Sequence, residues 1–257
     1  MLIDIHSHLD HHLLFNKLDG IIERAGNAGV KLIITNGINP ETNRKCLEIS
    51  RKYNIVKCAM GLYPRDALKK DIGTGDYPLK NESFDINEEI DFIRKNKNNI
   101  VAISEIGLDF VDGESRQQID DFRKMIKLAR EMDKPMIIHS RKAEQKCVEI
   151  LEEYDFRKII MHCFCGKKSL VKRIVDNGWY LTIPTVVRSE QFQQNARVVP
   201  IEQLFCETDS PYLSPHKEKL NEPAFVIESY NKISEIKGMP MSKVVEKIHG
   251  NWKKLFE

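Results

Sequence analysis

Short apolar runs of strand length alternate along the chain with longer segments whose apolar positions recur every three or four residues. The runs predict eight strands, at Leu2–His6, Lys31–Asn36, Ile55–Met60, Ile100–Glu105, Met136–His139, Lys158–His162, Trp179–Ile183 and Gln203–Glu207. Helical spacing is present at Ile119–Ala129 and Leu170–Val175, and again at Glu222–Ile236 and Met241–Leu255. Strict alternation of this kind favours a parallel sheet covered by helices, so the sequence predicts an α/β fold, a (β/α)8 TIM-type barrel.

One stretch, Lys69–Asp85, breaks the pattern. It contains Gly73, Gly75 and Pro78 and has no apolar period. Two interpretations stay open, an extended loop on the functional face of the barrel and a tolerated surface insertion. No internal repeat or linker divides the sequence, so a single domain is predicted over residues 1–257.

Composition narrows the class of protein without naming a partner. Charged residues make up 30% of the chain and hydrophobic ones 41%, and the net charge of +2 does not by itself indicate a nucleic-acid binder. The apolar runs are far shorter than the roughly 18 residues needed to cross a bilayer. The sequence opens directly on the strand-like LIDI, so we expect a cytoplasmic protein with no membrane association and no obligate protein partner. Its 6 cysteines are scattered, which is typical of reduced thiols.

Residues able to bind a metal recur where the predicted strands end. They are His6, His8, Glu105, His139, His162 and Asp209. Imidazole and carboxylate groups suit Zn, Mn or Mg. One such residue would be explained by packing, but six of them at strand ends predict a metal site. Cys163 and Cys165 flank His162, but a second thiol pair with suitable spacing is missing, so buried free thiols are the favoured interpretation.

In a parallel barrel the strands' C-terminal ends surround one mouth, which is where the active site lies. His6 and His8 are two residues apart and would project to the same side of an extended strand. They would hold one ion together with Asp209 and a shared Glu105. The same glutamate would hold a second ion with two further histidines, and ions about 3.5–4 Å apart can activate water. Asp209 is the predicted base.

The blocks around these residues resemble the TatD family of metal-dependent hydrolases, within the amidohydrolase-like barrel superfamily. The blocks occur in family order over essentially the whole chain, as LIDIHSHLD, SEIGLDF, PMIIHSRKA, MHCFCG and LFCETDSPYLSP, followed by NEP at Asn221–Pro223. The strand-eight block is the most specific of them. The resemblance implies a deoxyribonuclease-type, exonucleolytic cleavage of phosphodiester bonds, with DNA as substrate, two divalent ions as cofactors, and Glu105 as the bridging ligand.

Three positions depart from the family pattern. Ile5 stands where a small residue is usual, and Ser104 replaces the common glycine before Glu105. Tyr63, in Gly-Leu-Tyr-Pro, stands where bacterial members typically carry a histidine that lies near the substrate phosphate. A phenol can donate a hydrogen bond but does not titrate near neutral pH, and the following Arg65 would then supply positive charge. The alternative is that the tyrosine only packs.

Arg141 lies two residues beyond His139, so it would face the mouth and grip a phosphate. The alternative is a surface ion pair with an acid such as Glu144.

Three other functions also stay open. They are a D-aminoacyl-tRNA deacylase, which cleaves a carbonyl ester, a small-molecule amidohydrolase, and a non-catalytic scaffold barrel. Amidohydrolases often carry a carbamylated lysine on strand four, where this chain has glutamate.

Overall fold

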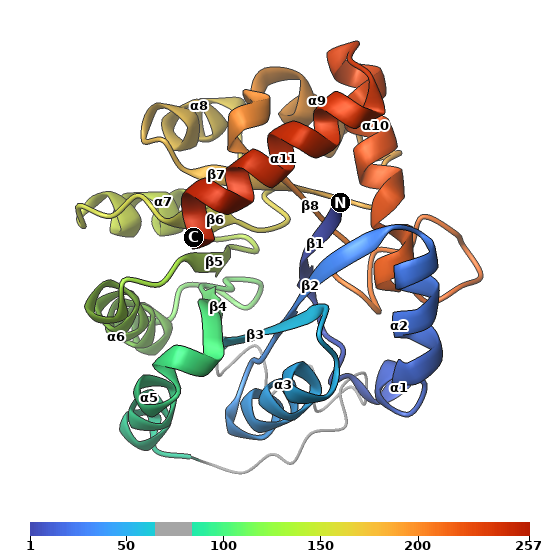
Figure 1. The fold of residues 1–257 in the computed structure, drawn as a ribbon. Coiled ribbons are helices and arrows are strands. Elements are labelled where there is room, and N and C mark those ends of the chain that lie inside the picture. Colours follow the sequence, from blue (N-terminus) through green and yellow to red (C-terminus); the bar gives the residue numbers. More distant parts are fainter. Residues whose placement is uncertain (65–83) are drawn as a thin grey trace.

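The computed structural model describes residues 1–64 and 84–257, and its centre is one sheet of eight parallel strands in the order β1 to β8 (Figure 1). The strands are β1 Leu2–Ser7, β2 Val30–Asn36, β3 Val56–Met60, β4 Ile100–Gly107, β5 Met136–His139, β6 Ile159–Met161, β7 Tyr180–Pro184 and β8 Leu204–Glu207. The predicted (β/α)8 TIM-type barrel is therefore confirmed. Arg65 and residues 69–83 of the predicted irregular stretch lie outside the described residues.

Helices follow the strands and lie outside them (Figure 1). They are α1 His12–Phe15, α2 Leu18–Asn27, α3 Pro40–Lys52, α5 Ile86–Lys95, α6 Arg116–Met132, α7 Glu144–Glu152, α8 Lys168–Asp176, α9 Glu190–Val198, α10 Ile227–Lys237 and α11 Met241–Phe256, with short 3-10 turns η1 Lys97–Asn99, η2 Ile201–Gln203 and η3 Pro223–Val226. The helix predicted from Glu222 was placed too early. Pro223 opens a 3-10 turn, and the α-helix begins only at Ile227.

Local sequence signals set where helices begin. Asn39 precedes α3, and its side chain accepts a hydrogen bond from the Thr42 N–H while Pro40 occupies the first turn. Ser115 caps α6 in the same way. No helix among the described residues has the length and apolar content that a membrane crossing requires.

The strands read as nearly continuous apolar runs because the sheet is buried on both faces. In β5, Met136, Ile137 and Ile138 are all fully buried, and the polar His139 comes only at the end of the strand. The same order applies along β6, where His162 follows Met161. Polar side chains therefore gather at the C-terminal mouth of the barrel.

The barrel closes at a seam between its first and last strands. The backbone contact is an isolated parallel bridge between Ser7 and Ser210. Deeper in the seam, the Asp4 carboxyl accepts hydrogen bonds from the Thr208 N–H at 2.9 Å and the Thr208 hydroxyl at 2.6 Å. Burial raises the pKa of Asp4 to about 8, although the bonds from Thr208 act in the opposite direction. Side-chain bonds thus supplement a short ladder.

A helix also seals the seam. The Ile3 N–H donates to the buried Tyr230 hydroxyl on α10 at 3.0 Å. The same hydroxyl donates to the Ile3 carbonyl oxygen at 3.2 Å. Buried backbone groups need such partners because an unpaired one carries a desolvation penalty. Tyr230 therefore supplies hydrogen-bond partners to the Ile3 backbone on β1, in place of partners from β8.

Candidate metal centre and pocket

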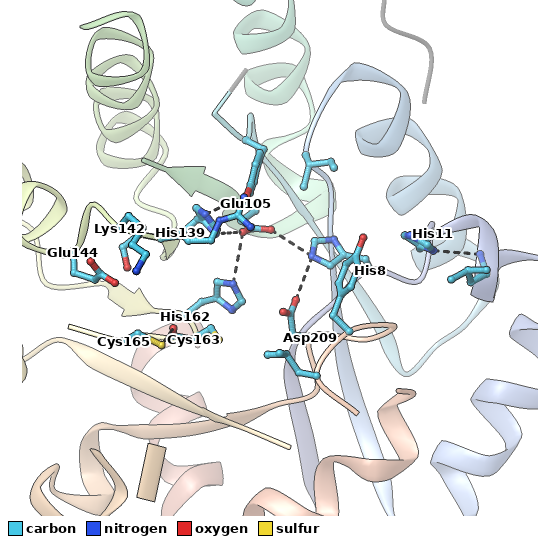
Figure 2. A pocket seen from close by; sticks show the side chains of 17 residues that line it. His8, His11, Glu105, His139, Lys142, Glu144, His162, Cys163, Cys165 and Asp209 are labelled. Atoms are coloured by element: carbon cyan, nitrogen blue, oxygen red, sulfur yellow. Dashed lines mark hydrogen bonds and ion pairs between the residues drawn. The ribbon is translucent and has the colours of Figure 1, made fainter. Parts of the chain in front are cut away.

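All six side chains predicted as metal ligands meet at the C-terminal mouth of the barrel. Glu105 lies on β4, with the others on or just after β1, β5, β6 and β8, namely His6, His8, His139, His162 and Asp209. Figure 2 shows Glu105 between His139 and His162 on one side and His8 on the other, with Asp209 facing the cluster. Three overlapping groups of these residues have ligand atoms within 4.8 Å of one another.

The two oxygens of the Glu105 carboxylate face different partners. Oε1 lies 2.9 Å from His139 Nδ1 and 3.6 Å from His162 Nε2. Oε2 lies 3.4 Å from Nε2 of both His6 and His8. This carboxylate therefore faces a β5–β6 side, formed by His139 and His162, and a β1–β8 side, formed by His6 and His8. Asp209 is counted with the β1–β8 side, although its ligand atom also lies within 4.8 Å of that of His162.

On the β1–β8 side, the candidate metal-ligand atoms are also close to one another. The Nε2 atoms of His6 and His8 are 3.2 Å apart, and Asp209 Oδ1 lies 3.7 Å and 3.5 Å from them. Asp209 has a φ of 56°, in the left-handed region, two residues after β8 ends. Aspartate adopts that region more readily than most residues, which permits the chain to turn there.

Both histidines of the β5–β6 side are held from behind by carboxylates. His162 Nδ1 lies 3.0 Å from Glu207 Oε2, and His139 Nε2 lies 2.9 Å from Asp109 Oδ2. Because an ionised carboxylate only accepts, each outer nitrogen carries a proton, and the inner nitrogen, which faces Glu105, is the one that would bind a metal once it has lost its own proton. This is the orientation that a metal-binding histidine needs.

His8 is oriented by the main chain instead. Its Nδ1 donates to the Asn36 carbonyl oxygen at 3.1 Å, so Nε2 is the nitrogen that faces Glu105 and that would bind a metal. The Nδ1 of His6 has no hydrogen-bond partner among the described residues, and its ring stacks on His162 at a centroid distance of 4.0 Å. The chemistry of this ligand set, with imidazole nitrogens and carboxylate oxygens converging, fits divalent ions.

The pKa shifts show how strongly charge is coupled here. Burial raises the pKa of Glu105, but hydrogen bonds from the surrounding histidines outweigh it and hold that pKa well below its ordinary value. Burial also raises the pKa of Asp209, but the hydrogen bond from His8 and the charges of the imidazoles outweigh it and lower that pKa. Burial lowers the pKa of His162, yet the Glu207 charge and hydrogen bond bring it to about 10. The carboxylates are therefore ionised and hold positive charge close to them.

Two glycines allow the strands to approach around Glu105. A Cβ atom at Gly61, just after β3, would overlap the backbone of Ser104 and Glu105. One at Gly107 would overlap the carbonyl of His139, and the φ of Gly107 is 144°. Larger residues at either position would displace β4 or β5 and with them a candidate ligand.

Of the three residues predicted to bind the substrate, Tyr63 and Arg141 are among the described residues. Tyr63 and Arg141 line the pocket, and each contacts Asp109 Oδ2, at 3.0 Å from the phenol oxygen and 2.6 Å from Arg141 Nε. The phenol oxygen is also 3.1 Å from His139 Nε2. Tyr63 is thus part of a polar network with Asp109 and His139. The acid that Arg141 contacts is Asp109, which the sequence analysis did not single out.

The centre opens into a cavity of about 720 Å³. Besides candidate ligands, its lining includes Lys142, Glu144, Cys163, Cys165 and an apolar group formed by Leu13, Tyr212 and Leu213. All six cysteines are free, and the three candidate metal groups contain only histidine, glutamate and aspartate.

The residues that sequence reasoning missed lie inside blocks it had already quoted. Asp109 follows Glu105 in SEIGLDF, and Glu207 precedes Asp209 in CETDSP. Both are fully or almost fully buried acids. A buried acid in a block with a metal ligand is a usable signal, because buried carboxylates need a charged or hydrogen-bonding partner.

The sequence and the fold both match known proteins. The family model described as TatD-related DNase matches residues 3–257. An uncharacterised metal-dependent hydrolase of Methanocaldococcus jannaschii is 33% identical over 256 residues, covering 99% of this chain and 96% of its own length. Human deoxyribonuclease TATDN3 is 30% identical over 264 residues, covering 99% and 94%.

A solved structure shares the architecture. The crystal structure of a TatD homologue from Escherichia coli superimposes with a TM-score of 0.86 at 24% sequence identity, covering 99% of this chain and 97% of the other. At that identity the likeness concerns the fold, and it is the fold derived above from the alternation of strands and helices.

Proposed function

The chain belongs to the family of TatD-related DNases, which makes it a metal-dependent hydrolase, and from this premise we propose that it cleaves phosphodiester bonds of DNA exonucleolytically. The observation that carries the proposal is the placement of Glu105, whose two carboxylate oxygens face two separate sets of histidines. A shared carboxylate between two donor sets is the arrangement that a two-metal hydrolase requires.

We propose two divalent ions, drawn from Zn, Mn and Mg, as cofactors. His6, His8, Glu105 and Asp209 would hold one, and Glu105, His139 and His162 the other. When bound, such ions lower the pKa of water and polarise a phosphoryl oxygen. Neutral imidazole nitrogens and ionised carboxylates suit all three metals.

In this proposal Asp209 is the general base. Its carboxylate is ionised, because the neighbouring imidazoles hold its pKa down, and its side chain is 15% exposed, so it can reach a water in the cavity. Glu105 acts beside it by fixing both donor sets relative to each other. Asp209 would accept the proton of the attacking water as the water oxygen forms its bond to phosphorus, while the P–O bond to the leaving sugar oxygen breaks and that oxygen takes up a proton from solvent.

Substrate binding is assigned to the opposite wall. Arg141 lines the cavity, and its guanidinium, which contacts Asp109 through Nε, carries the positive charge that would meet a phosphate. Tyr63 stabilises the same aspartate through its hydroxyl, and Arg65 would add charge on the segment that follows. The name of the human relative, a deoxyribonuclease, supports DNA as substrate.

The test is an assay of the purified protein, stripped with a chelator and then given Zn, Mn or Mg separately. We expect release of mononucleotides from single-stranded DNA labelled at one end, and none without metal. Mischarged D-aminoacyl-tRNA and small carboxylic esters are assayed in parallel. Faster metal-dependent cleavage of either would replace the nuclease by a deacylase or a small-molecule esterase. Inactivity on every substrate with every metal would favour a non-catalytic scaffold.

A further inference from the structure

One wall of the cavity is apolar and aromatic, although it adjoins a charged centre. Leu13 on α1 and Tyr212 and Leu213 after β8 line the same cavity as Glu105 and Asp209. Tyr212 is 40% exposed and Leu13 38% exposed. Large apolar side chains that stay exposed at the mouth of a polar pocket are typical of a ligand-binding surface.

Tyr212 lies on the β1–β8 side, beside two histidines. Its ring centroid is 6.4 Å from that of His8 and 5.6 Å from that of His11, with interplanar angles of 72° and 80°. Because both histidine rings stand nearly perpendicular to it, neither is stacked flat on the phenol ring. Figure 2 shows His8 and His11 on the side of the pocket opposite Lys142.

The loop that carries Tyr212 is fixed by buried polar groups. The Asn221 amide, fully buried, donates to the carbonyl oxygens of Thr208 and Tyr212, each at 2.7 Å, and to the Thr185 hydroxyl at 2.8 Å. That hydroxyl donates in turn to the Leu213 carbonyl at 2.7 Å. Leu213 has a φ of 54°, a conformation that leucine rarely adopts unless its surroundings impose it. The aromatic wall is therefore held in place before any ligand arrives.

We propose that Tyr212, flanked by Leu13, is the platform on which a nucleobase of the substrate stacks. The inference rests on the proposed phosphodiesterase function and adds which end of the pocket takes which part of a nucleotide. Arg141 and Lys142 line the other wall and would meet the phosphate backbone, so the base lies towards β8 and α1. A preset aromatic ring loses little conformational freedom on binding, and every base offers a π face to it.

The test compares a single-stranded dT oligomer with the same oligomer carrying abasic residues at its terminal positions, both with the metal that supports the highest activity. Stacking contributes about tenfold to base binding, so the KM of the parent enzyme should be about tenfold lower for the base-bearing oligomer. Tyr212→Leu should remove that difference by raising the KM for the base-bearing oligomer alone, with kcat within about twofold. Tyr212→Phe keeps the ring and should behave as the parent.

Leu220→Ala is the control, because Leu220 is 44% exposed and does not line the pocket. Equal KM values for the two oligomers in the parent enzyme would overturn the platform while leaving the phosphodiesterase function standing. So would a Tyr212→Leu variant that loses activity equally on both oligomers. Failure of the parent to cleave either oligomer with any metal would instead overturn the proposed function, and this inference with it.

Discussion

On the β5–β6 side of Glu105, each histidine has a carboxylate behind it, Glu207 for His162 and Asp109 for His139. On the β1–β8 side, His8 has only a main-chain carbonyl behind it, and negative charge comes from Asp209 at the front. A carboxylate behind a histidine raises the basicity of the ring, whereas one in front is itself a donor and a base. Under the proposed function, the β5–β6 side would mainly set metal affinity, and the β1–β8 side would take part in the chemistry.

Removing the residue that both sides share should have the largest effect. In Glu105→Ala we expect both ions to be lost and kcat/KM on DNA to fall at least about 1,000-fold, because metal stabilisation of several kcal/mol disappears. Elemental analysis of the protein and initial rates would measure this. Glu144→Ala, which removes a pocket-lining acid outside the candidate groups, is the control. Two retained ions or full activity would contradict the assignment.

The β5–β6 side can be changed on its own through Glu207, the acid that contacts the outer nitrogen of His162. Glu207→Gln keeps a hydrogen-bond acceptor for the Thr182 hydroxyl and the Cys163 N–H but removes the charge behind His162. We expect the affinity for the ion on the β5–β6 side to fall about 10- to 100-fold, and the affinity for the ion on the β1–β8 side to stay unchanged. Calorimetric titration with metal should then show two separated phases. Equal weakening of both phases would mean that the two sides do not act independently.

A smaller effect is expected from the phosphate contact. Arg141→Ala should lower kcat/KM on phosphodiesters about tenfold, because a charge-assisted hydrogen bond is lost. The metal content should not change, since Arg141 is not a candidate ligand and contacts the back of the β5–β6 side through Asp109. Arg141→Lys should recover part of the loss. Kinetics equal to the parent's would assign Arg141 to the structure of that wall.

Tyr63 should give the smallest change. Tyr63→Phe removes a hydroxyl that contacts Asp109 and His139, and a neutral hydrogen bond of this type corresponds to roughly a three- to tenfold loss in rate. Tyr63→His restores the residue usual in bacterial members of the family. A faster histidine variant on DNA would show that positive charge at this position matters, and unchanged rates in both variants would make Tyr63 a packing residue.

Most of the fold was predictable because burial on both faces leaves a simple signal. Predicted and observed strands differ by at most two residues at either end. β5 matches its predicted bounds, whereas at β6 Lys158–His162 was expected and Ile159–Met161 is found. The error at Glu222 arose because apolar spacing alone does not distinguish a 3-10 turn from an α-helix, while Pro223 does bias the local backbone.

The candidate ligands were predictable for the same reason, since each interrupts an apolar run at its end. Their supporting acids were not, because the partners of Glu207 and Asp109 lie 45 and 30 positions away along the chain. Sequence spacing describes neighbours on one element and carries no distance between elements. The contact between Arg141 and Asp109, 32 positions apart, was missed on the same ground.

The seam between β1 and β8 has a consequence for when this site comes into existence. His6 and His8 leave the ribosome first, but Asp209 follows some two hundred residues later, and the Asp4–Thr208 contact spans 204 positions. Contacts of such long range form late, after local helices and neighbouring strands. We therefore expect a nascent or truncated chain without β8 to hold the other five candidate ligands but not its base, so that hydrolytic capability arrives only after the β8 segment has been added.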